Sequence, residues 1–326
     1  MLLLLSPGAA LRSDLTVRKR QALIAASVFT ALALVAYRSA IAQTLEPSTS
    51  ETEGGASASA DPVPALLDLG FRDLYELNFE GARSQFVAYQ KARPRDPMGV
   101  VAEAASHLYE QFNAKGVLTS EFFLDDDKFL KGVDGTPAEN RNDPFLKANS
   151  RAREMAKAML KSNPNDRQAL LVLTMADGME SDYDALIIKK QMAGLSMMKQ
   201  AEAEATRLLA TDPDAQDAYL ALGASNYVIG CLPGYKRAFL WFGGVHGDRE
   251  RGIELMERAA EYGHYLSPFA KILLALAYER EHEPGRARVL LTELAREFPS
   301  NPLYARELAL IDHPSTSCRA TTSAPC

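Results

Sequence analysis

The segment from Gly252 to Pro302 constrains the fold more than any other part of this 326-residue chain. Apolar and small residues recur in it at the i, i+3, i+4 spacing of one helix face, three times in succession. The three sets are Gly252, Leu255, Met256, Ala259 and Ala260; Ala270, Leu273, Leu274 and Ala277; and Ala287, Leu290, Leu291, Leu294 and Phe298. Glu-Pro-Gly at 283–285 separates the second pattern from the third, and Pro299 and Pro302 end the third, because proline cannot continue a helix. The segment therefore predicts three successive antiparallel helices.

The same spacing recurs when residues are counted back from other prolines. In each case a small residue stands twelve positions before the residue that closes the second helix. These pairs are Ala82 and Pro94, Ala152 and Pro164, Ala201 and Pro213, Gly252 and His264, and Ala287 and Pro299. Leu69-Gly70 and Leu222-Gly223 add a first-helix signature. The pattern resembles a divergent tetratricopeptide repeat, whose unit is two antiparallel helices in about 34 residues. The resemblance implies an all-α solenoid of about five to six helix pairs over residues 63–312.

The repeat spacing is irregular, which predicts inserted segments. Successive closing positions are separated by 70, 49, 51 and 35 residues. The first interval predicts a hidden degenerate unit around Phe122 to Lys131. The next two predict insertions at Tyr183 to Ser196 and at Gly230 to Asp248. Insertions on one side of a solenoid are often its functional part.

The first 42 residues have the pattern of an export signal. A basic cluster at residues 17–20 precedes an apolar stretch, Ala22 to Tyr37, and Ala40-Ile41-Ala42 follows. This order is typical of a secretory signal peptide and predicts a mature amino terminus at Gln43. The alternative is an uncleaved membrane anchor, although the apolar core is shorter than the roughly 20 residues that span a bilayer. Either reading places the protein in the periplasm or at the cell envelope, as an exported bacterial type.

The segments that flank the repeat region are poor in apolar residues. Residues 43–62 are rich in Ser, Thr, Glu, Gly and Ala, which predicts a flexible linker, and residues 313–326 form a polar tail. In an exported chain Cys318 and Cys326 form a disulfide, or all three cysteines, Cys231 included, remain free thiols; the spacing leaves both open. The net charge of −6 argues against a nucleic-acid partner.

The sequence contains no recognisable catalytic constellation. Its five histidines form no H-E-x-x-H pair, and the glycines at 243–247 lack the spacing of a phosphate-binding loop. Asp125-Asp126-Asp127 lacks the ligand order of an EF-hand and predicts a solvated acidic turn. We therefore predict no catalytic residues, no metal site and no cofactor, and a protein that is not an enzyme.

The second insertion carries the most unusual composition in the chain. It combines the single tryptophan with three other aromatic residues and two basic ones, a mixture typical of the centres of protein interfaces. The candidate partner-binding residues are Tyr235, Lys236, Arg237, Phe239, Trp241 and Phe242. The alternative is that this segment plugs the inner face of the solenoid, with Phe239 and Phe242 buried.

The inner face of the array is predicted to be apolar. Tetratricopeptide proteins that capture peptide tails present Lys, Asn and Arg there, whereas this chain presents Phe71, Tyr75 and Tyr227. We therefore expect a scaffold or adaptor that binds a protein or peptide partner, of unspecified oligomeric state. The alternative is a solute- or lipid-binding protein of an envelope transport system, with a cavity lined by these residues and Trp241. An enclosed pocket favours the second function, and an open groove favours the first.

Overall fold

The computed structural model describes residues 62–125, 132–133, 142–232, 234, 237, 241 and 246–313. All of them belong to one compact unit, residues 59–326. The predicted signal peptide, almost all of the linker, and the tail beyond His313 lie outside the described residues, as do Cys318 and Cys326. Within the described part of the chain, no helix has the length and apolar character needed to span a bilayer.

Regular structure in the described residues is entirely helical, which confirms the predicted all-α class. The helices are α2 (Val63–Tyr75), α3 (Phe79–Ala92), α4 (Met98–Ala114), α5 (Ser120–Leu124), α7 (Pro144–Ser162), α8 (Arg167–Asp182), α9 (Gln191–Thr211), α10 (Tyr219–Cys231), α12 (Arg249–Tyr262), α13 (Ser267–Arg280), α14 (Pro284–Glu297) and α15 (Pro302–Asp312). A π-helical turn, η1 (Tyr183–Ile187), extends α8, and a 3₁₀ turn, η2 (Gln216–Ala218), precedes α10.

Local sequence accounts for the helix ends. Helices α3, α7, α9, α12 and α14 each end two residues before the predicted closing position. Polar side chains cap several helix starts; Asp248, for example, accepts a hydrogen bond from the Arg251 amide at 3.0 Å. Pro284 occupies the first position of α14, where its missing amide proton is not needed.

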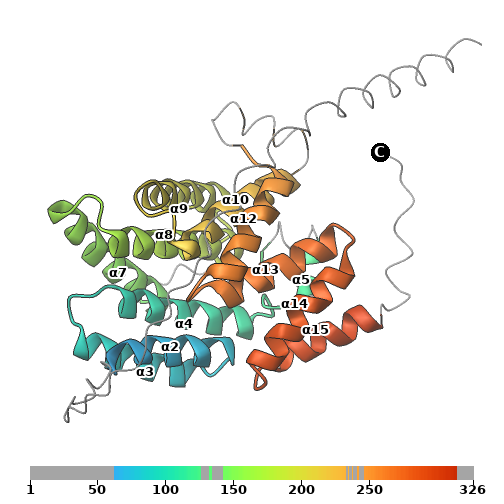
Figure 1. The fold of residues 1–326 in the computed structure, drawn as a ribbon, viewed down its shortest axis with the longest axis horizontal. Coiled ribbons are helices and arrows are strands. Elements are labelled where there is room, and N and C mark those ends of the chain that lie inside the picture. The colour runs from blue at the N-terminus through green and yellow to red at the C-terminus, as the bar shows by residue number, and fades with distance from the viewer. Residues whose placement is uncertain are drawn as a thin grey trace, which may run out of the picture. The chain divides into compact units, whose positions relative to one another are not determined.

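The helices pack as successive antiparallel pairs, which confirms the predicted α-solenoid (Figure 1). The pairs are α2–α3, α4–α7, α8–α9, α10–α12 and α13–α14, and α15 follows as a final helix. Helix α4 packs directly on α7, and α5 is the described helix between them in sequence. Most of the predicted hidden unit, Phe122 to Lys131, lies outside the described residues.

Small residues stand where paired helices cross. Ala82, Ala259 and Ala287 are fully buried at these crossings, as the repeat register predicted. Helices α10 and α12 approach most closely at Gly223 and Gly252, where a Cβ on Gly252 would lie 2.6 Å from the Tyr227 backbone nitrogen. Only glycine permits this backbone separation.

The first predicted insertion, Tyr183 to Ser196, forms no projecting loop. Its first residues continue α8 as the π-helical turn, and its last residues form the start of α9. Tyr183, Leu186 and Ile187 are buried in a second apolar cluster with residues of α4 and α7. The extra residues of this repeat therefore add buried apolar side chains to the core.

The array curls until its two ends meet. The ring of Phe71 on α2 stacks on Tyr265 with centroids 4.7 Å apart, and Tyr75 packs against Phe298 at 5.4 Å. The Tyr75 hydroxyl donates to the Tyr265 carbonyl at 2.8 Å, and the Asn301 side chain donates to the Tyr75 carbonyl at 2.8 Å. Because these contacts join the first helix to the last pair, we call them the seam.

A buried carboxylate shapes the turn that supplies one side of the seam. Asp217 in η2 accepts hydrogen bonds from the amides of His264, Tyr265 and Leu266 at 2.8, 3.1 and 3.1 Å. A Cβ on Gly263 would lie 2.7 Å from Asp217 Oδ1, so glycine keeps the turn close to the carboxylate. These bonds satisfy amides at the start of α13 and fix the position of Tyr265.

Replacing Ala259 or Ala287 with leucine is expected to destabilise the fold by about 1–3 kcal/mol, because neither crossing has room for three more carbons. Thermal or urea unfolding of the purified variants measures the change. Ala210→Leu on the exposed face of α9 is the control. Equal midpoints for all three variants and the parent would show that the repeat register is wrong.

Replacing Asp217 with alanine is expected to cost about 2–4 kcal/mol, because three amides of the seam turn lose their acceptor. Chemical unfolding measures this loss. The matched control is Asp214→Ala, an exposed carboxylate three residues earlier, which should change the unfolding free energy by less than about 0.5 kcal/mol. A similar small effect for both variants would contradict the importance assigned to the turn.

Candidate partner-binding surface

The second predicted insertion, Gly230 to Asp248, joins α10 to α12 and has a rigid base. A Cβ on Gly230 would lie 2.8 Å from the Arg249 backbone nitrogen, and one on Gly247 would lie 2.6 Å from the Gly230 nitrogen. The two ends of the segment therefore touch, backbone to backbone. Helices α10 and α12 are held close together at the Gly223–Gly252 crossing. The loop that joins them therefore begins and ends at fixed positions.

Two of the six predicted partner-binding residues have described side chains, and both are exposed. Trp241 has 60% of its surface accessible, and its ring meets His246 edge-on with centroids 6.3 Å apart. Arg237 is exposed and donates to the Gly230 carbonyl at 3.2 Å, which ties the loop to the end of α10. The side chains of Tyr235, Lys236, Phe239 and Phe242 lie outside the described residues.

The residues predicted to line the inner face are buried in contacts between packed helices. Phe71 and Tyr75 are each 4% exposed and form the seam. Tyr227, 8% exposed, donates to the Ala277 carbonyl at 3.2 Å. Since Trp241 is largely exposed, these four described residues do not enclose a common pocket.

The inner side of the array is crowded by its own side chains. Helices α2, α4, α8, α10 and α13 contact one another in succession and form the inner layer. Tyr109 on α4 reaches across to Phe269 on α13, with ring centroids 5.5 Å apart. Helix α5 packs on α13, and Ser120 at its start donates to Glu307 on α15. The described inner face is therefore filled by side chains and a short helix of the chain itself.

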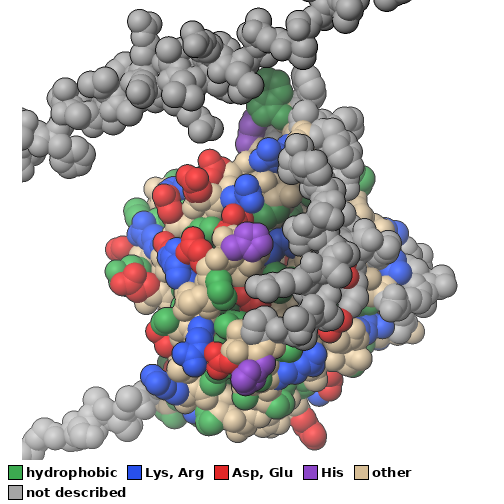
Figure 2. Space-filling view, turned by 90° about the vertical axis from the view of Figure 1, so that its right-hand side faces the viewer, with side chains coloured by type: hydrophobic (Ala, Val, Ile, Leu, Met, Phe, Trp, Pro, Cys, Tyr) green, Lys and Arg blue, Asp and Glu red, His purple; other side chains and the backbone are tan. Residues whose placement is uncertain are grey.

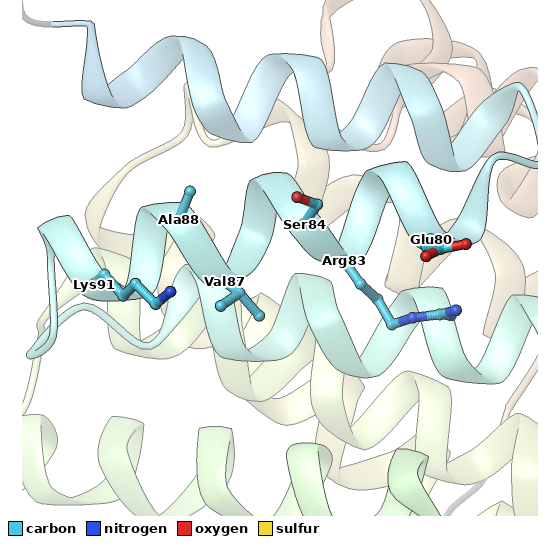
Figure 3. A pocket seen from close by; sticks show the side chains of 6 residues that line it. All are labelled: Glu80, Arg83, Ser84, Val87, Ala88 and Lys91. Atoms are coloured by element: carbon cyan, nitrogen blue, oxygen red, sulfur yellow. The ribbon is translucent and has the colours of Figure 1, made fainter.

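Two surface hollows are formed by described residues of the outer helices. One, of about 450 Å³, lies along α3 and is lined by Glu80, Arg83, Ser84, Val87, Ala88 and Lys91 (Figure 3). The other, of about 530 Å³, lies between α7 and the loop after α3 and includes Arg95, Met155 and Met159. Neither contains a residue predicted to bind a ligand. Figure 2 shows charged side chains of both signs interspersed over the described face of the molecule.

Sequence reasoning missed three carboxyls of the repeat array whose pKa is raised by burial. Burial raises the pKa of Asp182, at the end of α8, to about 7, and burial raises the pKa of Glu279 on α13 to about 7, with a further contribution from Glu307. Burial also raises the pKa of Asp177 to about 6 against the opposing effect of Arg153. Their positions follow from the curl of the array, so no local sequence pattern marks them. Among the described residues, no set of three or more His, Cys, Asp or Glu side chains could hold a metal ion.

Asp182 makes the fold sensitive to pH. Its carboxyl has a pKa near 7 when folded and about 3.9 when unfolded, so ionisation opposes folding. The resulting destabilisation is absent below about pH 4, grows as the pH rises, and is complete above about pH 7. Asp182→Asn is therefore expected to raise the melting temperature at pH 8 and to leave it nearly unchanged at pH 4.5. Asp184→Asn, two residues on, is the control. An equal gain at both pH values would mean that the charge of Asp182 is not the cause.

Comparisons with known proteins add a loose structural likeness. No protein-family model matches the chain, and no curated protein sequence matches it. Among solved structures, a thermophilic TPR (tetratricopeptide-repeat) protein from Thermus thermophilus is similar, with 15% identity and a TM-score of 0.42 over 76% of this chain and 98% of that chain. The assignment rests instead on the helix pairs and small-residue crossings of the chain itself. By these features the protein is a tetratricopeptide-like α-solenoid.

Proposed function

We propose that the protein is an exported, non-enzymatic scaffold or adaptor that binds a protein partner through the Gly230–Asp248 loop. The observation that carries this proposal is the exposure of Trp241, 60% accessible on a loop with a rigid base. Leaving a tryptophan in water forgoes a large gain from burial, and tryptophan is among the residues most enriched at binding hot spots. A rigid base also reduces the entropy lost when the loop binds.

The loop suits this role better than the inner face does. Repeat arrays usually offer an extended concave surface to a partner. Here the seam, the Tyr109–Phe269 contact and α5 occupy that side. A partner that approached from the inner side would have to displace packed aromatic side chains, whereas Trp241 is already exposed.

The basic residues of the loop extend the proposal to the chemistry of the partner. Lys236 and Arg237 adjoin the aromatic residues in sequence, and Arg237 is exposed. An aromatic anchor flanked by positive charge fits a partner surface with an apolar pocket and an acidic rim. The export signal predicted for residues 1–42 supports a partner in the periplasm or cell envelope.

Site-specific photo-crosslinking tests this function. A photoreactive phenylalanine analogue placed at position 241 is expected to capture a defined envelope protein in cells. The same analogue at Tyr262, an aromatic residue on α12 that is also 60% exposed, is the matched control and should not capture it. Capture of the same proteins from both positions, or of none from position 241, would contradict the proposal.

Substitutions then separate binding from stability. Trp241→Ala is expected to change the unfolding free energy by less than about 0.5 kcal/mol, because the side chain is exposed, and to weaken binding to the captured protein at least tenfold. Lys236→Ala/Arg237→Ala should slow association and reduce its dependence on salt. A loss of about 3 kcal/mol or more in stability for Trp241→Ala would instead show that the loop is a core plug.

A further inference from the structure

The outer surface formed by α3, the loop after it and α7 is basic, although the chain as a whole is acidic. Residues 79–97 and 144–162 contain nine lysines and arginines against three aspartates and glutamates. The whole chain has 36 basic and 42 acidic residues and a net charge of −6. The sign of the charge therefore distinguishes the exposed side of these two segments, which we call the basic surface, from the rest of the chain.

Four lysine and arginine side chains of the basic surface are available to a partner. They are exposed, and within the described part of the chain their side chains form no ion pair. These residues are Lys91, Arg95, Lys147 and Lys161. Arg83, on the same side of α3 as Lys91 (Figure 3), is by contrast paired with Glu110 at 2.8 Å. Cations without an internal partner gain from carboxylates that a binding partner brings to them.

One face of α7 joins basic side chains to an apolar hollow. Residues spaced by three or four positions share a helix face, and a row of exposed or half-buried residues has this spacing. They are Lys147, Arg151, Met155, Ala158 and Ser162. The last three line the hollow of about 530 Å³. Arg151 also donates through Nη1 to Gln90 Oε1 at 3.2 Å, which brings this face of α7 next to the last turn of α3.

The hollow combines an apolar lining with positive charge. Met155 and Met159 contribute apolar groups, and Arg95 lines the same hollow. Its acidic lining residue, Asp166, already accepts a hydrogen bond from the Ala169 amide at 3.0 Å at the start of α8. Methionine side chains are flexible and adapt to apolar groups of different shapes. The hollow is therefore suited to an apolar side chain that arrives with negative charge beside it.

The composition of the basic surface disfavours a membrane or a nucleic acid as its partner. The large hydrophobic side chains that are exposed in the described part of the chain all lie outside α3 and α7. The aromatic side chains of the two helices are buried; they are Phe79, Phe86, Tyr89 and Phe145. Helices α3 and α7, which are described throughout, therefore offer no large exposed apolar side chain to insert into a bilayer and no ring on which a base could stack.

We infer that the basic surface binds an acidic segment of a protein partner, with one apolar side chain of that segment in the hollow and its carboxylates beside the four exposed basic side chains. The row from Lys147 to Ser162 is about 22 Å long, because a helix rises about 1.5 Å per residue. About seven residues of extended chain span this distance. The surface shares no residue with the Gly230–Asp248 loop, so the inference goes beyond the proposed function and does not rest on it.

Peptide binding to the full chain tests this inference. The probe is a fluorescein-labelled peptide in which a central leucine is flanked on each side by three glutamates, and fluorescence anisotropy at low ionic strength measures its binding. The matched peptide with serine in place of leucine is expected to bind about fivefold more weakly, because it has no apolar side chain to place in the hollow. A peptide with lysines in place of the glutamates should not bind.

Substitutions of exposed residues locate the binding while preserving the fold. Arg95→Glu/Lys161→Glu is expected to weaken binding of the leucine peptide by about tenfold or more, because two charges beside the hollow are reversed. Ala158→Glu, which places a carboxylate in the hollow from an exposed helix position, should remove the preference for leucine over serine. The matched control is Arg296→Glu/Arg306→Glu, the same change of charge at exposed positions of α14 and α15, which should alter binding by less than about threefold.

Three results overturn the inference. One is equal binding of the leucine and serine peptides, and another is binding that Arg95→Glu/Lys161→Glu leaves unchanged. The third is binding of phosphatidylglycerol vesicles or of a single-stranded oligonucleotide when neither acidic peptide binds. Trp241→Ala should bind the leucine peptide as the parent chain does, so failure of this inference is distinguishable from failure of the proposed function. Loss of peptide binding in that variant would place the site at the loop and contradict a separate surface.

Discussion

The three hydrogen bonds that Asp217 accepts from residues 264–266 are the interaction on which the closed arrangement depends. They hold a turn that would otherwise leave amides without partners at the start of α13. The turn presents the Tyr265 ring to Phe71 and the Tyr265 carbonyl to the hydroxyl of Tyr75. Asp217 lies in the fourth helix pair and Tyr75 in the first. The turn that this one carboxylate holds in place is therefore one part of the fourth and fifth pairs that contacts the first helix.

Contact between the two ends of the array changes which of its surfaces is available for binding. An open solenoid offers its concave side as a binding surface, and adjacent repeats contribute to it in sequence. In this chain the same side is used for internal packing, by Tyr109 on Phe269 and by α5 on α13. The proposed recognition through the Gly230–Asp248 segment does not need this side, because Trp241 is exposed.

The elements of the fold could be predicted from sequence because their causes are local. Prolines and capping side chains mark the helix ends, and Ala82, Gly252 and Ala287 stand at the same position of a period that the chain repeats. Curvature could not be predicted in this way. The partners of Asp217 stand 47 to 49 residues away in sequence, and Ser120 and Glu307 are separated by 187 residues. Spacing alone also cannot distinguish an inserted segment from a hidden degenerate repeat, since both lengthen the chain equally.

The buried carboxyls show that closure is not optimised for stability alone. Asp182 and Glu279 both sit where burial opposes their ionisation, and an uncharged side chain of similar size at either place would remove that penalty near neutral pH. Their contributions have the same sign, so both weaken the closed arrangement as the pH rises towards 7. One of the two lies at the end of α8, where the helix widens into a π-helical turn, and the other lies near the end of α13. A chain that only needed a rigid array at neutral pH would gain stability from replacing both.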